Sequence, residues 1–112
     1  MPRQGAPHAL VVDDDEAIRE VVCEVLEQAG WCVTAAAGVR EGLTALRSGH
    51  HDIVLTDLAM PDGSGSQILQ AAARLAAPPP VVVMSGCLGG DGHLQLREAG
   101  ARHVLPKPFG LM

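Results

Sequence analysis

The sequence predicts an α/β domain of the doubly wound type, in which helices cover both faces of a five-stranded parallel sheet. The first observation is a series of short, continuous apolar runs, which suit strands buried on both faces. These runs cover Ala9–Val12, Cys32–Ala37, Ile53–Thr56, Val81–Met84 and His103–Leu105. The second observation is that a stretch with helical features separates each run from the next. Strands that alternate with helices imply a parallel sheet with right-handed crossovers.

The four helices are expected at about residues 18–29, 39–48, 66–76 and 92–99. The first has apolar side chains along one stripe and ends at Gly30, and Asp15 stands where its N-cap is needed. Three prolines at positions 78–80 end the third helix. The fourth is the weakest, because nearby glycines each cost roughly 0.5–1 kcal/mol of helix propensity.

Length and composition indicate one globular domain. The chain has 112 residues, of which 47% are hydrophobic and 19% charged, with a net charge of −5. An acidic domain is repelled by phosphate backbones, so we expect no nucleic-acid binding. No apolar run approaches the roughly 20 residues of a membrane span. Three cysteines without a CxxC pair indicate reduced thiols and a cytoplasmic location. Residues 1–7 are expected to form a flexible leader and residues 8–112 the domain.

Polar residues follow the predicted strands, and four of the strand ends carry candidate functional groups. Asp13 and Asp14 end the first strand and Asp57 the third, whereas Ser85 ends the fourth and Lys107 follows the fifth. Carboxyl ends of parallel strands meet at one edge of a sheet, where such folds bind ligands. We therefore expect these side chains to lie together, although Asp14 and Asp57 could instead cap the helices that follow.

The chemistry of this set points to a divalent cation and a phosphoryl group. Two carboxylates about 4 Å apart repel by about 4 kcal/mol at an effective dielectric constant near 20, so converging acids need raised pKa values or a cation. An oxygen-only set without His or Cys suits Mg2+ or Mn2+ better than zinc. A lysine and a hydroxyl beside a metal-bound carboxylate would bind a phosphoryl group, and the carboxylate could be the nucleophile.

Four motifs in order resemble the receiver domain of two-component response regulators. The resemblance covers about residues 9–110 and rests on LVVDDDE at 10–16, DIVLTDLAMPDGSG at 52–65, VVVMSG at 81–86 and LPKPF at 105–109. It implies a flavodoxin-like sheet with strand order 2-1-3-4-5. It also implies a signalling phosphoacceptor rather than an enzyme, supplied by a histidine kinase or phosphotransfer protein and acting on an output partner that the sequence does not identify.

The resemblance implies a role for individual residues. Asp57 would be the phosphoacceptor, with Asp13 and Asp14 as the acidic pair that binds Mg2+ and Asp14 as the more direct ligand. The backbone carbonyl of Ala59 would complete the metal site. The hydroxyl of Ser85 and the ammonium of Lys107 would contact the phosphoryl group.

Three features depart from the family's usual pattern. Val104 stands where receivers usually carry an aromatic switch residue, and Ala59 gives little side-chain control over an attacking water. Receivers also continue into a fifth helix after the LPKPF motif, whereas this sequence stops at Met112. We expect this helix to be absent or truncated and one sheet face to be left open. Such a chain should form a homodimer through that face or borrow a segment from a neighbour.

Other classes of protein fit these residues less well than a receiver domain does. A small Mg2+-dependent aspartyl-phosphate hydrolase of the haloacid-dehalogenase type would need a lid, for which 112 residues leave no room. A flavodoxin-like cofactor binder would need a phosphate-binding loop where four acids stand. A receiver-like interaction module without phosphorylation would be favoured if Asp57 or Lys107 were missing. The chain could be a stand-alone regulator or the receiver of a hybrid kinase.

Asp62 is interpreted as a turn residue, and His50 and His51 as surface or packing residues.

Overall fold

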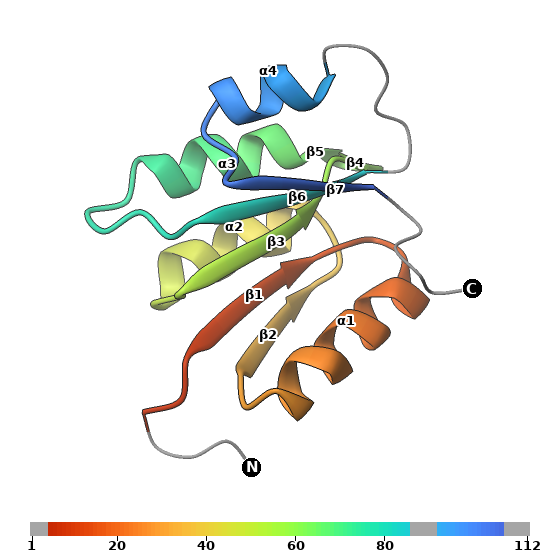
Figure 1. Ribbon diagram of the computed structural model, residues 1–112, viewed down its shortest axis with the longest axis vertical. Helices are drawn as coiled ribbons and strands as arrows, with labels where there is room; N and C mark the ends of the chain where they lie inside the picture. The colour runs from red at the N-terminus through yellow and green to blue at the C-terminus, as the bar shows by residue number, and fades with distance from the viewer. Residues whose placement is uncertain (1–4, 86–91, 107–112) are drawn as a thin grey trace.

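A five-stranded parallel sheet forms the centre of the computed structural model, which describes residues 5–85 and 92–106 (Figure 1). The strands lie in the order β2-β1-β3-β6-β7. They are β1 (His8–Val12), β2 (Cys32–Ala36), β3 (Ile53–Asp57), β6 (Val81–Ser85) and β7 (His103–Pro106). This order is the predicted 2-1-3-4-5, so the doubly wound, flavodoxin-like architecture is confirmed. The five predicted apolar runs match these strands to within one residue at either end.

The helices are divided unequally between the two faces of the sheet (Figure 1). They are α1 (Glu16–Gln28), α2 (Val39–Ser48), α3 (Gly65–Ala73) and α4 (Gly92–Glu98). Side chains alternate along β1, so Leu10 and Val12 join the apolar cluster under α2, α3 and α4. Val11 points the other way and packs with Val22 of α1. Among the described helices, α1 alone covers its face.

The core is aliphatic and lies on both sides of β1 and β6. All five residues of β6 are buried, and so are the last four residues of β1. A strand covered on both faces has no solvent side, which explains why these segments read as continuous apolar runs. Burial of each large aliphatic side chain contributes about 1.5–3 kcal/mol to folding.

Two features of the fold differ from the sequence-based prediction. A short antiparallel hairpin, β4 (Ala59–Met60) paired with β5 (Gly63–Ser64), lies between β3 and α3. In addition, α3 ends at Ala73 and not near Ala76. The chain tightens there, because the N–H groups of the next two residues donate to carbonyls only three positions back.

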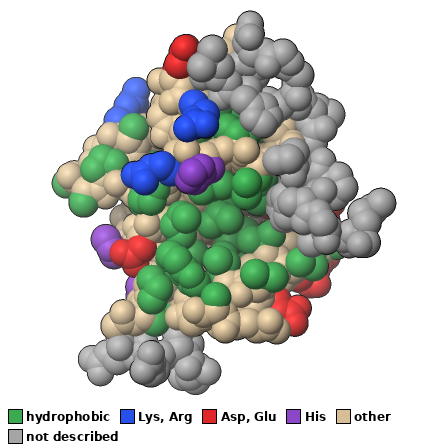
Figure 2. Space-filling model, viewed as in Figure 1, with side chains coloured by type: hydrophobic (Ala, Val, Ile, Leu, Met, Phe, Trp, Pro, Cys, Tyr) green, Lys and Arg blue, Asp and Glu red, His purple; other side chains and the backbone are tan. Residues whose placement is uncertain are grey.

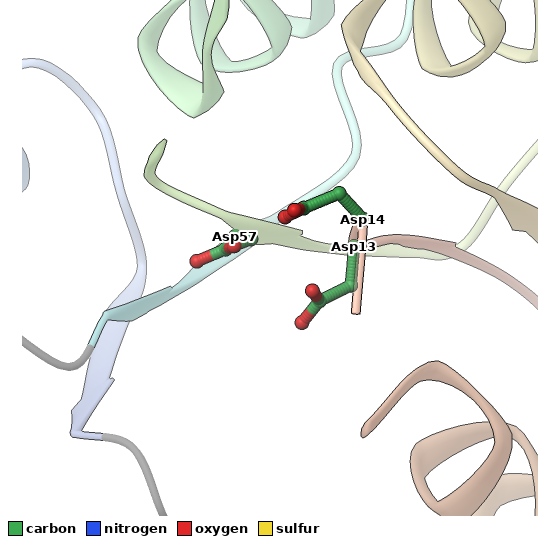
Figure 3. Close-up of side chains that lie close together, drawn as sticks. All are labelled: Asp13, Asp14 and Asp57. Carbon is green, nitrogen blue, oxygen red and sulfur yellow. The ribbon is translucent and has the colours of Figure 1, made fainter. Parts of the chain in front are cut away.

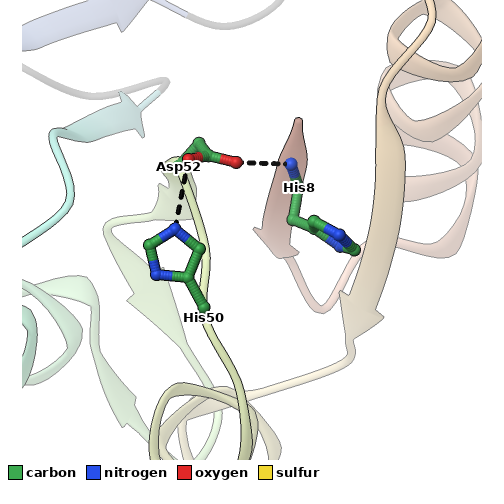
Figure 4. Close-up of polar contacts among 3 residues, drawn as sticks. All are labelled: His8, His50 and Asp52. Carbon is green, nitrogen blue, oxygen red and sulfur yellow. Dashed lines mark hydrogen bonds and ion pairs between the residues drawn. The ribbon is translucent and has the colours of Figure 1, made fainter. Parts of the chain in front are cut away.

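At the amino edge of the sheet, Asp52 ties β1 to the segment before β3 (Figure 4). Its carboxylate accepts the backbone N–H of His8 at 2.8 Å and lies 3.2 Å from Nε2 of His50. His51 beside it is buried, whereas His50 is exposed, in keeping with packing and surface roles. Trp31, which directly precedes β2 at this edge, is half-buried, and its backbone N–H donates to the backbone carbonyl of Leu26.

Some predictions concern residues that the structure does not describe. Lys107, most of the expected leader and the expected truncation of a fifth helix all lie outside residues 5–85 and 92–106. Within those ranges, none of the helices has the length and apolarity needed to cross a membrane.

Candidate functional site

Three carboxylates meet at the carboxyl edge of the sheet, where β1 and β3 end side by side (Figure 3). Asp13 and Asp14 follow the last residue of β1, and Asp57 is the last residue of β3. Each side chain offers an oxygen, and these oxygens all lie within 4.8 Å of one another. The structure therefore brings together the three acids that the sequence placed at this edge.

The burial of the three acids differs, and this difference shapes the site. Asp13 is 0% exposed and Asp57 is 8% exposed, whereas Asp14 faces solvent. Asp13 accepts the N–H of Asp15 at 2.9 Å, and Asp57 accepts the N–H of Leu58 at 2.9 Å. Backbone donors thus orient the two buried carboxylates, and Asp14 leaves an approach from solvent. Like charges at this separation favour the binding of a cation.

The donor set fits a hard divalent cation. It consists of carboxylate oxygens alone, and within the described residues it is the one group of three or more acids, histidines or cysteines that could hold a metal. Oxygen ligands suit Mg2+, Mn2+ or Ca2+, whereas zinc sites usually include nitrogen or sulfur. A carboxylate beside such an ion is also placed to act as a nucleophile.

Two further candidate residues lie around the acids. Ser85 is the buried last residue of β6, one position beyond Met84, which pairs with Asp57. Ala59 begins β4, two residues after Asp57, and its side chain is exposed. Lys107 lies outside the described residues, although Pro106 before it pairs with Ser85. The structure thus puts Ser85 and Asp57 on neighbouring strands at the same edge.

Val104, at the position of the usual aromatic switch residue, is half-buried in β7. It packs against the apolar cluster beneath α2, α3 and α4. A valine in that place contributes to the core and has no ring that could move between two positions. An output switch based on an aromatic side chain is therefore not built into this part of the chain.

Gly65 is the residue that lets α3 start against the end of β3. A Cβ added at this position would overlap the backbone carbonyl oxygen of Asp57. The Gly65 N–H donates to the carbonyl of Leu58 at 2.7 Å, which closes the base of the β4–β5 hairpin. The missing side chain thus permits a close approach of two backbone segments beside the proposed acceptor.

Two residues near the site have contacts that the sequence analysis missed. The guanidinium of Arg19 on α1 donates from Nη1 to the backbone carbonyl of Asp13 at 2.8 Å. No sequence pattern indicates this contact, because its acceptor is a backbone carbonyl. Asp62 lies in a turn, as predicted, and its carboxylate also accepts the N–H groups of Val39 and Arg40. These bonds span 23 and 22 residues, so no local pattern indicates them.

Asp15 behaves as predicted and caps α1. Its side chain accepts the N–H groups of Ala17 at 3.0 Å and Ile18 at 3.2 Å. This use of the carboxylate satisfies orphan donors of the first helical turn. Asp15 is accordingly a cap beside the acidic cluster rather than a member of it.

A doubly wound parallel sheet with three carboxylates at its carboxyl edge defines the class of open α/β proteins that bind ligands at that edge. The model of the response regulator receiver domain family matches residues 9–112. The chain belongs to this family. It is a receiver domain of two-component signalling, a domain that acts as a phosphoacceptor.

Individual relatives agree with the family match. The transcriptional regulator NtrC of Rhizobium meliloti is 35% identical over 102 residues, which cover 91% of this chain and 21% of NtrC. The receiver domain of HemR from Leptospira biflexa superposes with a TM-score of 0.86 at 32% identity, covering 94% of this chain and 85% of that one. TrrA from Thermotoga maritima, solved in complex with Mg2+–BeF, has a TM-score of 0.80 at 26% identity and covers 93% of this chain and 89% of its own. The chain thus spans about a fifth of the length of NtrC.

Proposed function

We propose that Asp57 is the phosphoacceptor and that Mg2+ is held by Asp13, Asp14, Asp57 and the backbone carbonyl of Ala59. The observation that carries this proposal is the convergence of three carboxylate oxygens within 4.8 Å at the end of β1 and β3. The Mg2+–BeF complex of TrrA supports the choice of cation. Mn2+ would satisfy the same oxygen donors.

The phosphoryl donor is proposed to be a phosphohistidine of a histidine kinase or phosphotransfer protein. A carboxylate oxygen of Asp57 forms a bond to phosphorus as the bond from phosphorus to the donor nitrogen breaks, and the imidazole leaves neutral after gaining a proton from solvent. The bound cation supplies charge that offsets the negative phosphoryl oxygens. Asp13 holds its place through the N–H of Asp15 while Asp14 faces the solvent from which the donor approaches.

Ser85 and Lys107 are proposed to contact the phosphoryl group once it is on Asp57. Ser85 supports this role because it ends β6, the strand next to β3, at the same edge of the sheet as Asp57. Lys107 would supply a positive charge from the end of β7.

The receiver is proposed to occupy residues 8–112, with residues 1–7 as a leader. An output partner and a second copy of this chain are the proposed binding partners.

Phosphorylation of Asp57 can be tested with acetyl phosphate, a small-molecule phosphoryl donor, and intact-mass analysis. We expect the wild-type chain to gain one phosphoryl mass only when Mg2+ is present, and Asp57→Asn to gain none. Asp52→Asn, which changes an aspartate at the opposite edge of the sheet, is the matched control and should be modified like the wild type. Phosphorylation that persists in Asp57→Asn would refute the assignment.

A further inference from the structure

The tip of the β4–β5 hairpin is bonded to the start of α2. Oδ1 of Asp62 accepts the Val39 N–H at 2.9 Å, and Oδ2 accepts the Arg40 N–H at 3.0 Å. The N-cap position of α2 is Gly38, which has no side chain and makes no side-chain cap bond. Asp62 therefore satisfies donors that helix starts normally satisfy with a local residue.

Gly38 also makes room for this contact. A Cβ at position 38 would lie 2.9 Å from Oδ1 and 3.1 Å from Oδ2 of Asp62, so the carboxylate would have to shift to make room for it. The φ angle of Gly38 is −173°, an extended conformation that any residue can adopt. The glycine therefore favours the present position of the neighbouring carboxylate, whereas its own backbone does not need a glycine.

The base of the same hairpin is bonded to the functional edge of the sheet. The Leu58 N–H donates to the carbonyl of Met84 at 3.0 Å, and the Gly65 N–H donates to the carbonyl of Leu58 at 2.7 Å. Ala59 lies between this base and the tip, and it pairs with Ser64 in a ladder of two residue pairs. So short a ladder is marginal by itself, and its geometry depends on what holds its two ends.

We infer that Asp62 is a positioning residue for the metal site: by fixing the hairpin tip on α2, it holds the backbone carbonyl of Ala59 where the cation needs it. This inference rests on the proposed function, in which that carbonyl is a ligand. The charged form of Asp62 is favoured by the same contacts, since the N–H groups of Arg40 and Val39 lower the pKa of its carboxyl group. Residues that orient metal ligands without touching the ion typically change metal affinity when they are replaced.

The test compares Mg2+ affinity in four folded variants, measured by calorimetric titration without any phosphoryl donor. We expect Asp62→Ala to raise the Kd for Mg2+ about tenfold, the lower end of such effects. Asp62→Asn keeps an oxygen acceptor for one of the two N–H groups and should recover part of the affinity. Gly38→Ala should weaken Mg2+ binding in the same direction, because its methyl group displaces the Asp62 carboxylate. Asp52→Ala, which removes a carboxylate that accepts a backbone N–H at the far edge, should leave the Kd unchanged.

A double variant and amide exchange separate positioning from simple stabilisation. Gly38→Ala should have no further effect on Mg2+ affinity once Asp62 is alanine, because the contact that it disturbs is already gone. Hydrogen exchange should become faster at the Val39 and Arg40 amides in Asp62→Ala. A Kd equal to that of the wild type in folded Asp62→Ala would overturn the inference, even with a lowered melting temperature. Failure of the wild-type chain itself to bind Mg2+ would instead refute the proposed function.

Discussion

At the residue scale, the site depends on how closely single atoms of different segments approach one another. The carboxylate of Asp13 accepts the backbone N–H of the residue two positions later, and that of Asp57 accepts the backbone N–H of the next residue. Their orientation is therefore set by the local backbone. The backbone around Asp57 can take this path only because residue 65 is a glycine: a side chain there would overlap the carbonyl oxygen of Asp57.

Replacement of Gly65 by alanine should damage both the fold and the site. The added methyl group would overlap a backbone oxygen that has no side-chain freedom to move away. Overpacking of this kind destabilises proteins by about 1–3 kcal/mol, and here it would also displace Asp57. Urea unfolding should show the loss of stability, and acetyl phosphate should label the variant less than the wild type.

Gly49→Ala is the control for that change. Gly49 has an extended backbone with φ of −157°, and the nearest atom to an added Cβ is Cε1 of His51 at 3.8 Å. Stability and labelling should both stay close to those of the wild type. Equal stability of Gly65→Ala and Gly49→Ala would show that the start of α3 can shift without cost.

The acidic residues could be predicted because each of them follows an apolar strand, and parallel strands carry their carboxyl ends to one edge. The same reasoning placed Asp15 as the cap of α1. It placed Asp62 in a turn but could not indicate that Asp62 also caps α2, because that helix starts more than 20 residues away in the sequence. Arg19 was overlooked for a related reason, since its acceptor is a backbone carbonyl that has no sequence signature.

At the scale of elements, periodicity was enough to place the sheet and the helices but not the short connections. Strands such as β6 are buried on both faces and appear as apolar runs, whereas β4 and β5 have two residues each and no such run. The end of α3 was predicted three residues too late. Its alanines favour helix, but the chain must turn before the prolines that lead into β6.

Three histidines, His8, His50 and His51, lie near the amino ends of β1 and β3, and the protonation of His51 should affect stability. Burial of His51, and then the nearby His8 and His50, lower the pKa of its imidazole below the usual 6.5, although Asp52 acts in the opposite direction. Because the folded-state pKa is the lower one, the unfolded chain binds the proton more tightly. The folded state therefore has its full stability above pH 6.5 and loses stability as the pH falls through the pKa of folded His51.

Urea unfolding at pH 7.5 and at about pH 5.5 checks this dependence. The wild type should lose stability between the two values, and His51→Asn should lose less, because its side chain does not titrate. His50→Asn is the matched control: it changes an exposed histidine beside the same aspartate. Equal pH dependence in the wild type and in His51→Asn would contradict the assignment.

At the scale of the whole molecule, the described helices cover only part of the sheet face on which α1 packs. Helix α1 packs on β1 and β2, and none of the described helices lies over β7 on that side. Leu105 of β7 is 39% exposed, and Val21 and Val25 of α1 are 38% and 60% exposed. Figure 2 shows hydrophobic side chains gathered across the middle of this view. Apolar surface of this kind commonly marks an interaction site.

We expect this face to cause concentration-dependent self-association of the chain. Light scattering should show a mass above that of the monomer, and Leu105→Glu should shift the population towards monomer, because a charge would be buried in the contact. Thr34→Glu, an exposed position on β2, is the control and should leave the mass unchanged. A chain that remains monomeric at every concentration and unfolds cooperatively with ordinary stability would contradict this expectation. It would show that the exposed apolar face does not cause association.

The position of Trp31 has a practical consequence for measuring these effects. It is the only tryptophan of the chain, and it lies at the amino edge, about 20 Å from the level of the acids at about 3.3 Å per residue along the strand. Its fluorescence should therefore respond to unfolding while remaining insensitive to direct contact with a metal ion. A ligand that binds only the folded chain stabilises it by about 2.7 kcal/mol at a hundred times its Kd. Emission recorded at one end of the molecule can thus report the occupancy of the other end through the folding equilibrium that the two ends share.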